Sequence, residues 1–175
     1  EKTPDFVFTA YQAEMPVGYY LGLAYLRLGQ FEAGRQAVDK IKAAAKRPLV
    51  RLLKAELVLK AGDHNLALKQ ARALTKDYPN NLRASLLLGQ GLVQAGKIDE
   101  ARGLFEGMIA QHPDEPKGYY GLGLIEVQAK RYVQARAAFE QALGRNGDDA
   151  EALSYLSSSL VAEGKVDEAV QRVEK

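Results

Sequence analysis

Residues 82–115 contain two runs of apolar residues with the spacing of an amphipathic helix, separated by a glycine. The apolar residues are Ala84, Leu87, Leu88 and Val93 before Gly96, and Ile98, Ala101, Leu104, Phe105, Met108 and Ile109 after it. Apolar residues three and four apart lie on one face of a helix. Asp99 and Glu100 fall in the first turn of the second run, where carboxylates complement the helix dipole, and Pro113 ends it. We therefore predict two helices joined at Gly96.

The same pattern recurs along the chain with a fixed period. The residues at the place of Gly96 follow one another at 33 or 34 residues and are Gly29, Gly62, Gly96, Lys130 and Gly164. Small residues stand seven places before, at Gly22, Ala55, Gly89, Gly123 and Ser157, and five places after, at Gly34, Ala67, Ala101, Ala135 and Ala169. Such self-similarity is the signature of a helical solenoid, in which neighbouring units bury each other's apolar faces. We expect about ten helices in antiparallel pairs over residues 17–175, without a sheet.

The small residues have a steric role in this interpretation. Gly89 and Ala101 let the two helices of one pair approach closely, and a bulky side chain at either place would cost roughly 1–3 kcal/mol. Further recurring stretches are Tyr20-Leu21-Gly22-Leu23-Ala24-Tyr25, Leu88-Gly89, Asp99-Glu100-Ala101, Tyr119-Tyr120-Gly121-Leu122-Gly123 with Ala135 and Phe139, and Asp167-Glu168-Ala169, with prolines at Pro79 and Pro113. With these residues the sequence resembles the tetratricopeptide repeat family.

The resemblance covers about residues 15–175. It implies a right-handed α-solenoid whose concave face is lined by the first helix of each pair, usually a groove that binds peptides. The units it implies are about 15–47, 48–81, 82–115, 116–149 and 150–175, with the last one truncated.

Four residues depart from the family pattern. Gly34 replaces the usual alanine, which should cost about 1 kcal/mol of helix stability, and Lys54 replaces an apolar core residue. Glu126 stands where an aromatic is preferred, and Lys130 replaces the turn glycine. Since Glu126 and Lys130 are four residues apart in the favourable order, they could pair on the helix surface for about 0.3–0.5 kcal/mol.

The two ends differ from the middle. Residues 1–16 do not fit the repeat, and we predict a short helix from Asp5 to Met15 that partly caps the first unit. The last helix, over 166–174, carries an apolar stripe of Val166, Val170 and Val173 that nothing in the sequence covers. We therefore expect that the chain continues naturally beyond Lys175, or that further repeats, another molecule or self-association covers this helix.

Composition sets limits on the function. The 175 residues are 47% hydrophobic and 26% charged, as in a soluble folded protein, and the net charge of +2 is too small to indicate nucleic-acid binding. No apolar run reaches the roughly 18 residues of a membrane span. The chain has no cysteine, and it starts at Glu1 without an initiator methionine or a signal peptide, so we expect a processed product or a fragment. Bacterial periplasm and cytoplasm both remain open.

The sequence contains no convincing catalytic, cofactor or metal site. His64 and His112 are the two histidines, and each is expected in or near a connection between helices. The run Ser157-Ser158-Ser159 lacks a neighbouring base, which a nucleophile needs. The sequence Gly121-Leu122-Gly123 lies within a predicted helix rather than after a strand, so helix packing explains it better than phosphate binding. We assign no catalytic residue, cofactor or metal.

The resemblance places the partner-binding residues on the concave face. The candidates are Tyr19, Leu23, Arg27, Glu56, Lys60, Arg83, Gln90, Gln94, Lys117, Tyr120, Leu124 and Gln128. Tyr19 and Tyr120 are the favoured anchors, because tyrosine offers rigid apolar area with a polar tip. The basic candidates could hold an acidic segment, or could be ordinary solvated charges, and the leucines could pack between helices instead. Tyr19, Leu23 and Leu53 occupy places of the family's two-carboxylate clamp, which disfavours the chaperone-binding branch.

Three functions are compatible with this surface. The leading hypothesis is a non-catalytic module that binds a protein or peptide partner in its groove. The alternative is a structural scaffold segment of a larger bacterial envelope assembly, for secretion, polysaccharide export or outer-membrane assembly. A third possibility is the regulatory arm of an enzyme whose catalytic domain lies elsewhere in the parent chain.

Overall fold

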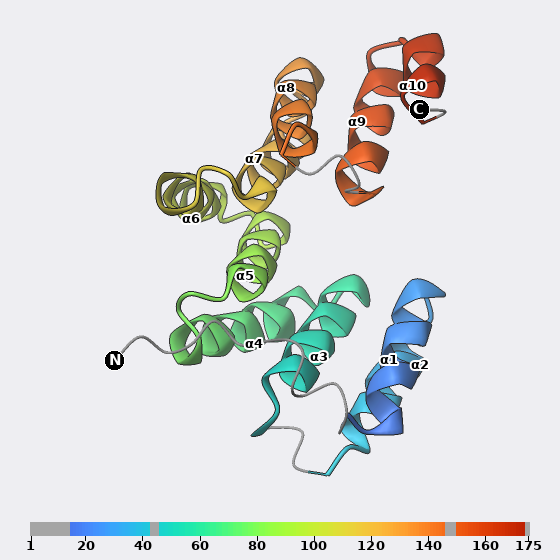
Figure 1. Cartoon of the computed structure of the whole chain (residues 1–175), viewed down its shortest axis with the longest axis vertical. Helices are drawn as coiled ribbons and strands as arrows, with labels where there is room; N and C mark the ends of the chain where they lie inside the picture. Colours follow the sequence, from blue (N-terminus) through green and yellow to red (C-terminus); the bar gives the residue numbers. More distant parts are fainter. Residues whose placement is uncertain (1–14, 43–45, 146–149, 174–175) are drawn as a thin grey trace. The chain divides into compact units, whose positions relative to one another are not determined.

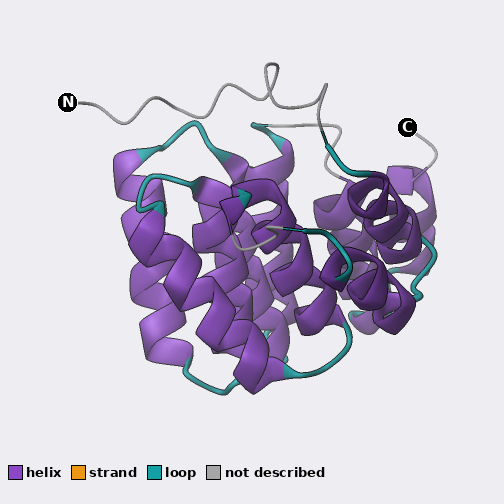
Figure 2. Ribbon diagram, turned by 90° about the horizontal axis from the view of Figure 1, so that it is seen from below, coloured by secondary structure: helices purple, strands orange, loops and turns teal. Residues whose placement is uncertain are grey.

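The computed structural model describes residues 15–42, 46–145 and 150–173, and within them it contains ten helices and no strand (Figures 1 and 2). The helices are α1 (Val17–Arg27), α2 (Phe31–Asp39), α3 (Pro48–Lys60), α4 (His64–Asp77), α5 (Leu82–Gln94), α6 (Ile98–Gln111), α7 (Pro116–Gln128), α8 (Tyr132–Leu143), α9 (Ala150–Ala162) and α10 (Val166–Val173). The prediction of an all-α chain with about ten helices is confirmed. The predicted helix from Asp5 to Met15 falls almost entirely outside the described residues.

The helices belong to two compact units, residues 1–91 and 92–175. In the first unit, α1 packs on α2, α2 on α3 and α3 on α4, while α1 also contacts α3 directly. In the second unit, α6, α7, α8 and α9 each pack on the helix that follows. The direct contact between two first helices, α1 and α3, shows that neighbouring pairs stack side by side as the repeat requires.

The periodic glycines end the first helix of each pair. Gly29, Gly62, Gly96 and Gly164 have φ of 70°, 89°, 73° and 79°, and Lys130 has φ of 57°. This left-handed conformation lets the chain leave a helix and reverse direction, and glycine adopts it without steric cost. The period seen in the sequence is therefore the period of this turn.

The small residues permit the close helix contacts that the sequence predicted. A Cβ atom added to Gly22 would lie 2.6 Å from Val38 Cγ2, and one added to Gly123 would overlap the ring of Phe139. Gly34 departs from the family pattern for a similar reason. A Cβ there would lie 2.7 Å from Leu57 Cδ2, so glycine fits a site where alanine would crowd the next pair.

Each unit has its own apolar core. The first contains fully buried Val38, Val50, Leu53, Leu57, Val58 and Leu74. The second contains fully buried Phe105, Ile125, Phe139, Leu156 and Leu160. These side chains come from both helices of successive pairs, and in the first unit they form two clusters, one around Leu53 and one around Leu74.

Two polar residues that depart from the family pattern, Glu126 and Lys54, form ion pairs in the structure. Glu126 does not pair with Lys130, which the sequence allowed. Glu126, whose side chain is 12% exposed, instead accepts hydrogen bonds from Arg102 at 2.9 Å and from Arg131 at 2.5 Å, while Lys130 adopts the left-handed turn. Lys54 avoids the core by pairing with Asp39 at the surface.

Candidate partner-binding surface

Three of the predicted concave residues meet in the first unit. Tyr19 on α1, Glu56 on α3 and Arg83 on α5 come from three successive first helices. Arg83 Nη2 donates to Glu56 Oε2 at 2.6 Å, and both side chains are partly exposed, at 42% and 26% respectively. This charge-assisted contact links α3 and α5 on this face.

Tyr19 is buried next to Glu56 and Arg83. Its residue exposure is only 8%, and burial raises the pKa of its hydroxyl, while the nearby Arg83 guanidinium acts in the opposite direction. Tyr19 also packs edge-on against the ring of Tyr20 at 5.7 Å. Its apolar area therefore packs in the core beside Val38 and Leu53.

The other candidates in the first unit lie on the same three helices. Leu23 is half-buried and packs against the core, and Gln90 is half-buried on α5. Arg27 and Lys60 are exposed in the last turns of α1 and α3, where a cation complements the helix dipole.

In the second unit the candidate tyrosine, Tyr120, is also buried. Tyr120 is 3% exposed, and its ring lies 5.8 Å from that of Phe139 and 5.9 Å from that of Tyr155. Such a contact contributes to stability beyond the buried area alone. Replacing Tyr120 by alanine would therefore remove core packing as well as a candidate contact for a partner.

The remaining candidates of this unit are more accessible. Gln94 and Gln128 are exposed and Leu124 is half-buried. Lys117 Nζ lies 3.0 Å from Glu115 Oε2, so its charge is locally compensated. The candidate residues left accessible in the second unit are thus mainly amide and aliphatic groups.

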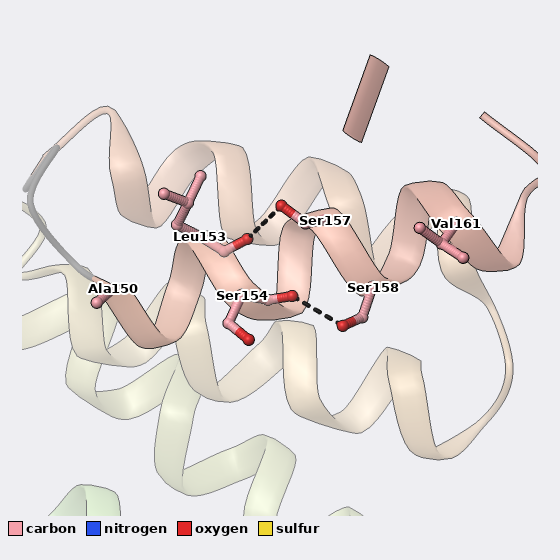
Figure 3. Close-up of a pocket in the computed structure, with 6 residues that line it drawn as sticks. All are labelled: Ala150, Leu153, Ser154, Ser157, Ser158 and Val161. Carbon is pink, nitrogen blue, oxygen red and sulfur yellow. Dashed lines mark hydrogen bonds between the residues drawn. The ribbon is translucent and has the colours of Figure 1, made fainter. Parts of the chain in front are cut away.

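The sequence interpretation missed a groove along α9 (Figure 3). Its lining residues are Ala150, Leu153, Ser154, Ser157, Ser158 and Val161, and its volume is about 520 Å³. The hydroxyls of Ser157 and Ser158 each donate to the carbonyl four residues earlier, at 2.9 Å. The sequence did contain one indication of this groove. Ser154 and Ser158 stand at the repeat places of Tyr120 and Leu124, and their side chains are much smaller.

Charged groups in the described residues form pairs across neighbouring helices. Arg51 pairs with Asp77 at 2.7 Å, and Arg136 lies 3.4 Å from Glu163. Within those residues, no group of three or more His, Asp or Glu side chains could hold a metal ion. None of the helices that the structure describes has both the length and the apolar character needed to cross a bilayer.

Family models for the tetratricopeptide repeat match residues 16–40, 52–116, 86–138 and 126–175. The chain therefore belongs to the tetratricopeptide repeat family. A curated relative is Cellulose synthase operon protein C of Xanthomonas axonopodis pv. citri (strain 306), 27% identical over 110 residues. The match covers 58% of this chain and 7% of that protein.

Solved structures share the fold at low sequence identity. TTC0263, a thermophilic protein of this family from Thermus thermophilus, superposes with a TM-score of 0.75 at 22% identity, covering 89% of this chain and 86% of that one. A MamA protein of Desulfovibrio magneticus RS-1 gives a TM-score of 0.55 at 18% identity, covering 92% and 94% respectively. The fold is thus the all-α tetratricopeptide solenoid predicted from the sequence, and this fold serves protein–protein interaction scaffolds.

Proposed function

We propose that the chain is a non-catalytic interaction module that binds a peptide or partner domain on the face formed by its first helices. The observation that carries this proposal is the meeting of Tyr19, Glu56 and Arg83 from three successive first helices. A surface assembled from equivalent places of stacked repeats presents regularly spaced groups to an extended partner.

The proposed partner is complementary to the exposed groups of this face. The pair of Glu56 and Arg83 offers one acceptor and one donor edge, and Arg27 adds an exposed positive charge on α1. We propose that Gln90 supplies a further hydrogen bond in the first unit, where buried Tyr19 helps to hold the helices, and that Gln94 and Gln128 offer amide groups on the second unit, which holds buried Tyr120. A segment with mixed polar character and at least one carboxylate fits the groups of the first unit.

Two charge reversals of equal size test this function. The full chain, with Arg27→Glu on a first helix and Lys69→Glu on α4 as the matched control, is used to capture partners from an extract of its source organism. Both residues are exposed, so neither change should unfold the chain. The captured partner should bind the Arg27 variant on the order of tenfold more weakly and the Lys69 variant normally. Equal binding by both variants would place the partner on another face.

A second candidate is a structural scaffold segment of a bacterial envelope assembly. It is supported by the likeness to Cellulose synthase operon protein C, whose name connects it with polysaccharide synthesis. Fractionation of source cells with an antibody against the chain tests it: co-fractionation with envelope protein complexes is expected, and recovery only in the cytoplasm would refute it.

A further inference from the structure

One face of α1 is apolar and exposed. We call it the head face, and its residues are Val17, Tyr20, Leu21, Ala24 and Leu28. Val17 is 75% exposed and Leu28 is 69% exposed, although both are large apolar residues. Their spacing follows one side of the helix, so the exposed groups form a stripe rather than scattered points.

Equivalent residues in the later repeats show what this face of the helix normally contacts. The residues at the place of Val17 in the later first helices are all buried, and they are Val50, Ala84, Gly118 and Ala152. The residues at the place of Ala24 are also buried, and they are Leu57, Gly91, Ile125 and Ser159. Leu57 lies against Gly34, and Gly118 lies against Ile109, which both belong to the preceding pair. In every later repeat, therefore, this side of the first helix is an interface with the pair before it.

The opposite side of a repeat is exposed only in the last pair. We call this the tail face, and its residues are Ser154, Ser158, Val161, Val166 and Val170. Val161, Val166 and Val170 are 52%, 53% and 49% exposed. Their counterparts in the four earlier repeats are half-buried or buried: Leu26, Leu59, Val93 and Val127 for Val161, Phe31, His64, Ile98 and Tyr132 for Val166, and Arg35, Leu68, Arg102 and Arg136 for Val170. The groove along α9 lies on this face (Figure 3).

We propose that the head face of one copy of this chain docks on the tail face of a second copy, so that the chains associate head to tail. A second copy is the proposed occupant because its α1 resembles α9, which packs on the preceding pair within the chain. Where α9 packs on the fourth pair, Tyr155 stacks on Phe139 at 5.6 Å and lies 5.9 Å from Tyr120. Tyr20 holds the same repeat place in α1 as Tyr155 holds in α9.

The groove gives the incoming helix room. The fourth pair presents Tyr120 beneath Tyr155, whereas the fifth presents Ser154, whose small side chain leaves part of the groove of about 520 Å³. A second copy's α1 brings an aromatic ring and aliphatic groups to this hollow. Because the two faces are different, the contact is heterologous, so repeated contacts build a ring or an open chain instead of stopping at a symmetric dimer.

Three valines in the first turns of helices allow a matched test. Val17 begins α1, Val166 begins α10 and Val133 is the second residue of α8. Glutamate in a first turn complements the helix dipole, so none of the three substitutions should unfold its helix. Val133 is 56% exposed, and its counterparts Glu32, Asn65, Asp99 and Asp167 are exposed in every repeat, which makes Val133→Glu the control.

Sedimentation velocity of the purified 175-residue chain over a hundredfold concentration range measures the association. The unsubstituted chain and Val133→Glu should form dimers and larger species as concentration rises. Val17→Glu and Val166→Glu should each weaken association on the order of tenfold or more. Ala24→Glu repeats the head-face test at a second place, should Val17→Glu disturb the helix by circular dichroism.

Mixing distinguishes head-to-tail contact from other modes. Val17→Glu retains an intact tail face and Val166→Glu an intact head face, so an equimolar mixture should form a dimer that does not grow further. The proposal is overturned if the unsubstituted chain stays monomeric at every concentration, if Val133→Glu weakens association as much as the end variants, or if the mixture stays monomeric.

Discussion

The substitution Gly121→Ala adds a methyl group where α7 crosses α6. A Cβ atom at this place would overlap the Cδ1, Cε1 and Cγ atoms of the Phe105 ring. Phe105 is fully buried, so its ring has no solvent-filled space into which it could turn. The collision therefore has to be relieved by moving α7 away from α6 or by forcing Phe105 from its rotamer.

The magnitude is the sum of two opposing effects. Replacing glycine by alanine within a helix stabilises it by about 0.8–1 kcal/mol. Overpacking a well-filled core costs about 1–3 kcal/mol, and the directness of this overlap favours the upper end. We expect Gly121→Ala to lower the free energy of unfolding by about 1–2 kcal/mol.

Gly103→Ala is the control for helix propensity. Gly103 is exposed on α6, and a Cβ added there would meet no heavy atom within 4 Å. This variant should gain about 0.8–1 kcal/mol, so the same chemical change has opposite signs on two neighbouring helices.

Urea denaturation followed by circular dichroism measures both variants. Amide hydrogen exchange along α6 and α7 should accompany it, because solenoids can lose stability locally. A Gly121→Ala protein as stable as the Gly103→Ala protein would refute the claim that the glycine is required by close contact with Phe105.

Two further predictions concern the fourth pair. Lys130→Gly should stabilise the chain by about 0.5–1 kcal/mol, because Lys130 has φ of 57° where the other turns use glycine. Thermal denaturation measures this effect, with Gln128→Gly at the end of α7 as the control. The pKa of Glu126 is lowered, mainly by its hydrogen bond from Arg131, so its stabilising contribution is present above the ordinary carboxyl pKa and is lost as pH falls through the lowered value. Glu126→Gln should therefore show a weaker loss of stability on acidification than the unsubstituted chain, and identical acid profiles would contradict this.

The architecture could be predicted because it depends on features that recur. The left-handed turns at Gly29, Gly62, Gly96 and Gly164 follow from a steric rule that acts on single residues. Close packing at Gly123 follows in the same way from the absence of a side chain. With several copies of each signal in fixed register, the helices and their pairing were recoverable without a structure.

The ion pairs could not be predicted, because long side chains choose among several partners. Glu126 has a lysine four residues later in sequence, yet it pairs with Arg102, which is 24 residues away, and with Arg131. Which partner is reached depends on the distance between neighbouring pairs of helices. The resemblance to the family describes typical residues at each place and gives no information on that spacing.

The tyrosines show a related difficulty at the candidate surface. A helix position indicates which side of the repeat a residue occupies, but depth depends on the size of its neighbours in the next pair. Tyr120 is buried because Tyr155 of the following pair covers it. Ser154 occupies the same place one repeat later, and it is exposed beside a groove. Equivalent places can thus hold a core residue in one pair and an exposed residue beside a groove in another.

This dependence on the neighbour separates the two proposed interactions. Arg27 and Val17 lie at opposite ends of α1, and only the place of Val17 is buried by a preceding pair in every later repeat. A charge change at Arg27 should weaken binding of a partner on the first helices and leave head-to-tail association intact. A charge change at Val17 should do the reverse. Loss of both properties in either variant would mean that the two surfaces act as one site, and the assignment of separate functions to them would then be wrong.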